Sequence, residues 1–250
     1  MKVLLYLEGK SILEKSGIGR ALHHQMRALD LGDYDVVHIN TYGPRSLMLL
    51  HAAKRRGKKV IMHGHSTRED FENSFIGSNF MASLFGKYLA HMYQKADYVI
   101  TPSEYSKKLI QSYGVTTPII AVSNGIDLKK YGKDPRKEEV FRDYFGIEEG
   151  QPVVICAGLY FQRKGIEDFV KVAEKMSHVR FIWLGSISKW LIPKKIRDIV
   201  NGKHPDNVSF PGYFTGDVFQ GAMSGANAFF FPSYEETEGI VVLEALSCEI

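Results

Sequence analysis

The chain has 250 residues, of which 44% are hydrophobic, 24% charged and 12% aromatic, a composition typical of soluble globular proteins that excludes disordered, collagen-like and coiled-coil chains. At this length, either one large domain or two domains of about 125 residues can bury a full core. The two cysteines, Cys156 and Cys248, are too few for a disulfide scaffold and have no partners at metal-ligand spacing, so we expect a reducing compartment.

Charge is distributed unevenly along the chain. The net charge is +4, but residues 1–122 carry a net +6 and residues 123–250 a net −2. The basic half favours an anionic partner such as lipid headgroups, phosphates or nucleic acid, and a solvated basic face without a partner fits it equally well. Only five or six apolar residues precede Glu8, too few for a signal peptide, and no stretch approaches the ~18 apolar residues of a membrane span. We therefore expect a cytoplasmic protein.

In the first half, short runs rich in Val, Ile and Leu alternate with longer amphipathic segments, a pattern typical of βαβ units and a parallel sheet. The predicted strands are Val3–Leu7, Val36–Asn40, Lys59–His63, Tyr98–Thr101 and Ile119–Val122. The predicted helices between them are Gly19–Leu31, Pro44–Arg56, Phe80–Ala96 and Glu104–Tyr113.

The same alternation repeats in the second half. The predicted strands there are Val153–Ala157, Arg180–Leu184, Val208–Phe210 and Ala228–Phe231. The predicted helices are Ile166–Met176, Lys194–Asn201, Val218–Ser224 and Ile240–Leu246. The sequence therefore predicts an α/β protein with two doubly wound parallel sheets.

A polar stretch, Lys129–Lys137, with a turn at Asp134-Pro135, separates the two sets. We place the boundary before it, which gives one domain of residues 1–126 and another of residues 127–250. Because ligands bind beyond the carboxyl ends of parallel strands, we expect a site in a central cleft lined by loops of both domains. Residues 31–33 lead directly into a strand and Ile250 follows soon after a helix, so we expect segments to be missing at both places.

Two glycines, Gly17 and Gly19, lie between the first predicted strand and the first predicted helix. Backbone N–H groups and the positive end of a helix can hold a phosphate at such a turn. A nicotinamide dehydrogenase is disfavoured, because no acidic residue closes the second strand to bind a ribose.

The segment after the last predicted strand carries the most chemistry. Glu236 and Glu244 are eight positions apart, and Gly239 and Ile240 begin a helix between them. The unpaired N–H groups at that helix start can receive a diphosphate. The spacing places Glu236 in the loop and Glu244 about one turn inside the helix, where both can hold sugar hydroxyls. An acidic turn that only complements the helix dipole is the alternative.

The predicted helix 80–96 has apolar residues at helical spacing, among them Phe80 and Phe85, with Lys87 and Lys95 on one flank. This pattern fits a helix lying on an anionic bilayer. Packing in a core explains the apolar residues equally well. The stretch 190–195, Trp-Leu-Ile-Pro-Lys-Lys, is a second apolar and basic segment with the same two interpretations.

Several of these motifs, in this order, resemble one family over nearly the whole chain. They are Asn124-Gly125-Ile126-Asp127, Arg163-Lys164-Gly165 after the strand ending Ala157-Gly158, and Glu236 and Glu244 after Phe-Phe-Pro-Ser. The set resembles the retaining nucleotide-sugar glycosyltransferases of family four, which have the GT-B fold. The segments 1–20, 63–67, 158–161 and 233–244 resemble, more narrowly, the bacterial diglycosyl-diacylglycerol synthases, which make the glycolipid anchor of lipoteichoic acid.

The resemblance implies roles for residues of the second half. Glu236 would contact the donor hexose, Glu244 the ribose of the nucleotide, and Lys164, helped by Arg163, the diphosphate. Leu159 stands where the family commonly has an arginine, which shifts weight to Arg163.

In the first half, the resemblance implies that His65 contacts the donor sugar. It fits this role better than His63, because Glu69-Asp70 follow it at the family's distance. The catalytic set implied by the resemblance is therefore His65, Lys164 and Glu236.

The implied reaction moves galactose or glucose from UDP-galactose or UDP-glucose to glucosyl-diacylglycerol, with retention and without a metal or cofactor. The enzyme would be peripheral on the inner face of the cell membrane, and no nucleic acid partner is expected. A covalent route through a carboxylate and attack from the face of the leaving group both remain open. A family-four enzyme with a soluble or polysaccharide acceptor, and a nucleotide-sugar or lipid-surface binding module without turnover, are the alternative functions.

Overall fold

The computed structural model describes residues 1–8 and 34–250, which form two compact units. The first unit comprises Met1–Glu72 and Asn79–Gly125, and the second comprises Asn73–Ser78 and Ile126–Ile250. The predicted boundary lies one residue from the division at Gly125, but the hexapeptide Asn73–Ser78 belongs to the second unit. The predicted helix Gly19–Leu31, with Gly17 and Gly19, lies outside the described residues.

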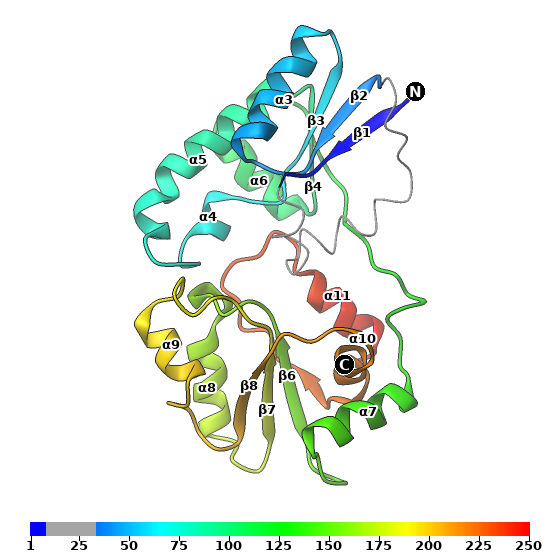
Figure 1. The fold of residues 1–250 in the computed structure, drawn as a ribbon, viewed down its shortest axis with the longest axis vertical. Helices are drawn as coiled ribbons and strands as arrows, with labels where there is room; N and C mark the ends of the chain where they lie inside the picture. Colours follow the sequence, from blue (N-terminus) through cyan, green and yellow to red (C-terminus); the bar gives the residue numbers. More distant parts are fainter. Residues whose placement is uncertain (9–33) are drawn as a thin grey trace. The chain divides into compact units, whose positions relative to one another are not determined.

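The first unit contains a five-stranded parallel sheet in the order β1-β2-β3-β4-β5 (Figure 1). The strands are β1 (Val3–Tyr6), β2 (Val36–Ile39), β3 (Lys59–His63), β4 (Tyr98–Thr101) and β5 (Ile119–Ala121). The helices are α3 (Pro44–Arg55), α4 (Arg68–Phe71), α5 (Ser78–Lys95) and α6 (Glu104–Ser112). Helix α3 packs on β2 and β3, and α6 packs on β4 and β5. Most residues of the central strands β2 and β3 are buried, as expected for parallel strands that are covered on both faces.

The second unit contains a four-stranded parallel sheet in the order β8-β7-β6-β9. The strands are β6 (Val153–Ala157), β7 (Arg180–Leu184), β8 (Val208–Gly212) and β9 (Ala228–Phe229). The helices are α7 (Pro135–Phe145), the 3-10 turn η1 (Gln162–Lys164), α8 (Ile166–Glu174), α9 (Lys194–Val200), α10 (Gly216–Gly225) and α11 (Ile240–Ser247). The chain winds outward from β6 to β8 and then returns to the other side of β6 as β9, so the strand order reverses between β6 and β9.

Helix α7 lies partly in the stretch that the sequence indicated as a polar separator. The Asp134 side chain accepts hydrogen bonds from the backbone N–H groups of Arg136 (3.0 Å) and Lys137 (3.4 Å), and Pro135 occupies the first turn. Asp-Pro therefore begins a helix here rather than marking a turn. Phe141 on this helix is fully buried, because α7 packs along α10.

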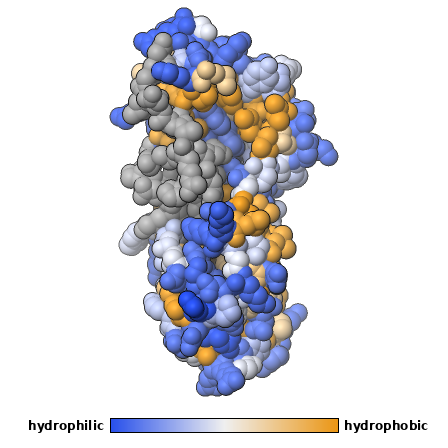
Figure 2. All heavy atoms as spheres, turned by 90° about the vertical axis from the view of Figure 1, so that its right-hand side faces the viewer, coloured by the Kyte–Doolittle hydropathy of each residue, from blue (hydrophilic) through white to orange (hydrophobic). Residues whose placement is uncertain are grey.

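On the face that Figure 2 shows, hydrophilic residues cover much of the second unit, and apolar residues gather in separate patches on both units. Among the described helices, none has the length and apolar character needed to cross a bilayer.

Candidate functional site

The candidate donor site lies at the carboxyl ends of β6 and β9. The loop after β6 leads through Gly158 into η1, which carries Arg163 and Lys164, and the loop after β9 carries Glu236. These strands are neighbours, and the strand order reverses between them. Ligands of open parallel sheets bind beyond the carboxyl ends of the strands at such a reversal.

Lys164 and Glu236, both expected at this site, are in direct contact. The Lys164 ammonium donates a hydrogen bond to Oε1 of Glu236. The Ser233 hydroxyl donates to the same oxygen over 2.7 Å, and Nη1 of Arg163 lies 3.8 Å from it. The Lys164 and Glu236 side chains are 13% and 22% exposed. Two cations and a carboxylate thus meet where water reaches them only in part, which strengthens their interaction with a charged ligand.

The Arg163 side chain is held rigidly. Its Nη1 donates to the backbone oxygen of Glu235 (2.8 Å), and its Nε donates to Oγ of Ser74 (2.9 Å). Its backbone N–H donates to the carbonyl of Asn73 (3.0 Å). The residue is 7% exposed, and a cation so buried requires such partners. The hexapeptide Asn73–Ser78 therefore orients an arginine 89 positions from Ser74 in the sequence, a contact that no local motif indicated.

Gly165 lets the loops after β6 and β9 approach closely. Its φ is +77°, and a Cβ placed on it would lie 2.1 Å from the carbonyl oxygen of Pro232. Beside it, the Tyr234 N–H donates to the carbonyl of Arg163 over 2.8 Å. Only glycine fits this conformation and this approach without displacing the backbone.

Helix α11 begins as its sequence predicted. Gly239 precedes it with φ +74° and without a capping side chain, and Ile240 is its first residue. Glu244 is the fifth residue of the helix and fully buried, whereas Glu236 lies in the preceding loop. The structure thus places both carboxylates where their spacing predicted them. The roles of Glu244 toward a ribose and of Gly239 and Ile240 toward a diphosphate stay predictions.

In the first unit, His65 belongs to a stack of three histidines. Its ring lies parallel to that of His63, with centroids 3.8 Å apart, and His63 is parallel to His38 at 5.3 Å. Nε2 of His65 is 3.3 Å from Oδ1 of Asn40, whose Nδ2 donates to the carbonyl of His38 (3.4 Å). An amide oxygen only accepts, so a hydrogen bond between Oδ1 and Nε2 requires the proton of the neutral His65 ring on Nε2.

The histidine stack is uncharged at neutral pH. Burial lowers the pKa of His38 to about 4, of His63 to about 2 and of His65 to about 3. His65 therefore offers a neutral hydrogen-bonding ring. The Tyr42 hydroxyl supports it, donating to the carbonyl of His63 (2.5 Å) and accepting from the N–H of His65 (2.6 Å). Sequence reasoning missed Asn40 and Tyr42, because a strand-end amide and an isolated tyrosine carry no motif.

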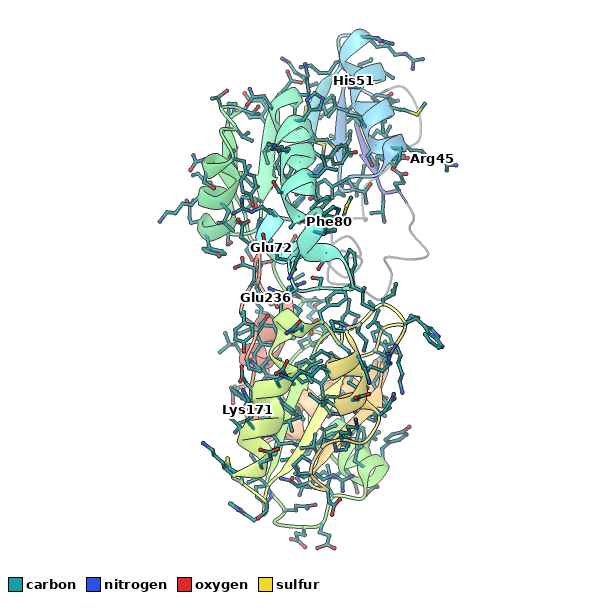
Figure 3. All side chains as sticks on the ribbon, turned by 90° about the vertical axis from the view of Figure 1, so that its left-hand side faces the viewer. Arg45, His51, Glu72, Phe80, Lys171 and Glu236 are labelled. Carbon is teal, nitrogen blue, oxygen red and sulfur yellow. The ribbon has the colours of Figure 1, made fainter. Side chains whose placement is uncertain are left out.

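For helix α5, the sequence pattern allowed an exposed apolar face or packing in a core, and the structure shows each in a different part of the helix. Phe80 is 89% exposed at its start (Figure 3), and Lys87 and Lys95 are exposed further along. The apolar residues of its second half pack in the core of the first unit. Phe85, predicted to face a membrane, is instead half-buried and stacks on Phe71 with centroids 4.3 Å apart. The apolar outer surface of α5 is thus confined to its first two turns.

Comparisons with known proteins agree with this arrangement of sheets and loops. Residues 10–130 match the family described as Glycosyltransferase Family 4, and residues 151–250 match the family described as Glycosyl transferases group 1. The chain belongs to glycosyltransferase family 4 and has the GT-B fold. The fold class and family that the sequence motifs indicated are confirmed.

Individual relatives indicate more specifically which members of the family this chain resembles. The chain is 47% identical to the processive diacylglycerol alpha-glucosyltransferase of Acholeplasma laidlawii, over 99% of this chain and 76% of that protein. It is 26% identical to the alpha-galactosylglucosyldiacylglycerol synthase of Streptococcus pneumoniae, covering 86% of this chain but 58% of that protein. Among solved structures, Anabaena HepE in complex with UDP-glucose matches with a TM-score of 0.68 and 19% identity, over 98% of this chain and 70% of HepE.

Proposed function

We propose that this chain transfers glucose from UDP-glucose to diacylglycerol-based lipid acceptors at a membrane surface. The observation that carries the proposal is the 47% identity over 99% of the chain to a diacylglycerol glucosyltransferase. The cluster of Arg163, Lys164 and Glu236 at the strand-order reversal supports it. The same relative favours glucose over galactose and adds diacylglycerol itself to the expected acceptor, glucosyl-diacylglycerol.

The cluster suits the departure of a nucleoside diphosphate. As the bond between the anomeric carbon and the diphosphate oxygen breaks, negative charge grows on the leaving group and positive charge on the sugar. Lys164 and Arg163 would stabilise the diphosphate, and Glu236, released from Lys164, would accept hydrogen bonds from hexose hydroxyls. The acceptor hydroxyl would form the new bond on the face that the diphosphate leaves and give its proton to the departing phosphate, so that the α-configuration is retained.

His65 would serve the donor sugar as a neutral partner. A neutral histidine ring has one nitrogen that accepts a hydrogen bond, and through it His65 would accept from a hydroxyl group of the sugar. Such a bond orients the hexose without adding a positive charge next to an anomeric carbon that itself becomes positive.

Radiolabelled sugar transfer into vesicles tests the proposal. We expect labelled lipid from UDP-glucose with vesicles that contain diacylglycerol or glucosyl-diacylglycerol, and little from UDP-galactose. Activity should persist in EDTA, since no step is assigned to a metal. Product formed only from UDP-galactose would contradict the donor assignment. Product formed from soluble sugars but not from lipid would favour a family-four enzyme with a soluble acceptor.

A further inference from the structure

The second unit presents an apolar surface built from two segments that are far apart in the sequence. Trp190, Leu191 and Ile76 have exposed fractions of 83%, 49% and 59%. The Ile76 N–H donates to the carbonyl of Leu191 over 2.9 Å, so the hexapeptide Asn73–Ser78 and the turn before α9 lie side by side. We call these three residues the Trp190 patch.

The backbone beneath the Trp190 patch is firmly anchored. Ile192 is fully buried in the core of the second unit, next to two exposed neighbours. The Leu191 N–H donates to the carbonyl of Ser188 (3.0 Å), which closes a turn. The Arg197 guanidinium lies over the Trp190 ring, 6.0 Å from its centroid. The large side chains therefore point outward from a fixed support, which is unfavourable in water unless another surface covers them.

Basic residues flank Trp190 and Leu191 in the sequence. Residues 189–197 contain Lys189, Lys194, Lys195 and Arg197 and no acidic residue. Two carboxylates lie beside this segment: Glu167 pairs with Lys195, and Asp198 pairs with Lys203. Tryptophan is enriched at the headgroup level of bilayers, where basic residues meet anionic lipids. Each basic residue there contributes about 1 kcal/mol of attraction to anionic lipid.

We propose that the Trp190 patch is a contact of the second unit with an anionic lipid bilayer. The charge selects this occupant, because a protein partner or a second copy would have to supply a matching acidic surface around an apolar centre. The inference rests on the proposed lipid acceptor. Its test needs neither donor nor acceptor, so the two can fail separately.

The two tryptophans make the test selective. Trp183 is fully buried and its Nε1 donates to the carbonyl of Gly158 (2.9 Å), whereas Trp190 is exposed. Vesicles of phosphatidylcholine and phosphatidylglycerol with brominated acyl chains should quench Trp190 and shift its emission to the blue. Pure phosphatidylcholine vesicles should have little effect. The W190F variant should lose the response, and Lys194→Gln with Arg197→Gln should weaken vesicle binding by about tenfold or more.

A matched control distinguishes vesicle binding through the Trp190 patch from nonspecific binding through any exposed apolar side chain. Ile76→Ser with Leu191→Ser should weaken vesicle binding, whereas Leu128→Ser with Val140→Ser, which removes exposed apolar side chains elsewhere in the second unit, should not. Vesicle binding without quenching of Trp190 would overturn the proposal. A blue shift that depends on protein concentration and needs no vesicles would also overturn it, in favour of self-association.

Discussion

At the scale of single residues, the candidate site groups of the two units differ in charge: a charged pair lies in the second unit and a stack of neutral rings in the first. In the second unit, Lys164 and Glu236 pair with each other, and a bound diphosphate and sugar would separate them. In the first unit, three stacked histidines, of which His63 and His65 are buried and His38 is half-buried, are neutral. A charged pair can exchange partners when a ligand arrives, whereas the neutral stack keeps its geometry over a wide pH range.

The charged pair gives the first prediction. Lys164→Ala and Glu236→Gln should each lower kcat/KM for UDP-glucose by about 100-fold or more, because each removes a group that meets charge developing in the transition state. Initial rates with lipid vesicles measure the effect, and circular dichroism verifies the fold. Lys171→Ala is the matched control, since Lys171 is exposed on α8, away from Glu236 (Figure 3). Near-normal rates in both site variants would remove the assigned roles.

The histidine stack gives a second prediction, on stability. The unfolded chain binds protons at its histidines near pH 6.5, while the folded pKa values are about 2 to 4. The unfolded state then binds more protons, so the free energy of unfolding should fall as pH drops from about 6.5 toward 5, by up to about 1.4 kcal/mol per pH unit for each histidine. Above about pH 7 this contribution is complete.

Urea unfolding at several pH values measures this dependence. His63→Gln should flatten the curve between pH 5 and 6.5, where carboxylates contribute little, whereas His178→Gln, which replaces an exposed histidine, should not. A stability that does not change across this interval in the unmodified chain would contradict the neutral stack.

At the scale of elements, helix α7 packs along α10 and contributes to the core of the second unit. Its residues pack along α10, and the hydroxyl of Ser224 accepts a hydrogen bond from the Asp134 N–H (2.7 Å). Close approach depends on Gly221, where an added Cβ would lie 1.9 Å from the carbonyl oxygen of Lys137. The segment that follows the first unit is thus an integral part of the second unit's core.

This packing predicts a specific sensitivity. Gly221→Ala should destabilise the protein by about 1–3 kcal/mol, because the methyl group meets backbone that cannot rotate away. Gly132→Ala is the control, since its Cβ would have 3.7 Å to the nearest atom. Thermal unfolding measures both. Equal stability of the two variants would mean that α7 and α10 separate easily, contrary to the structure.

At the scale of the whole molecule, local sequence patterns predicted the strands. They did not predict that the hexapeptide Asn73–Ser78 belongs to the second unit. Buried parallel strands are short apolar runs, and β3, β4, β6 and β7 have the predicted bounds. The spacing of Glu236 and Glu244 likewise predicted a loop and a helix position. By contrast, nothing near Ser74 indicates that it bonds to Arg163, 89 positions away. Such a contact depends on tertiary packing, which no local periodicity contains.

The hydrogen bond between Ser74 and Arg163 gives the last prediction. Ser74→Ala removes the acceptor for Nε of Arg163, and a hydrogen bond to a charged group contributes about 1.5–3 kcal/mol. If Arg163 binds the diphosphate, the KM for UDP-glucose should rise about tenfold or more, and the KM for the lipid acceptor should change little. Ser74→Thr, which keeps the hydroxyl, should restore most of the affinity, and Ser83→Ala, on the exposed surface of α5, should leave it unchanged. A purely structural role would instead lower the melting temperature and leave KM as it was, so both quantities must be measured on each variant.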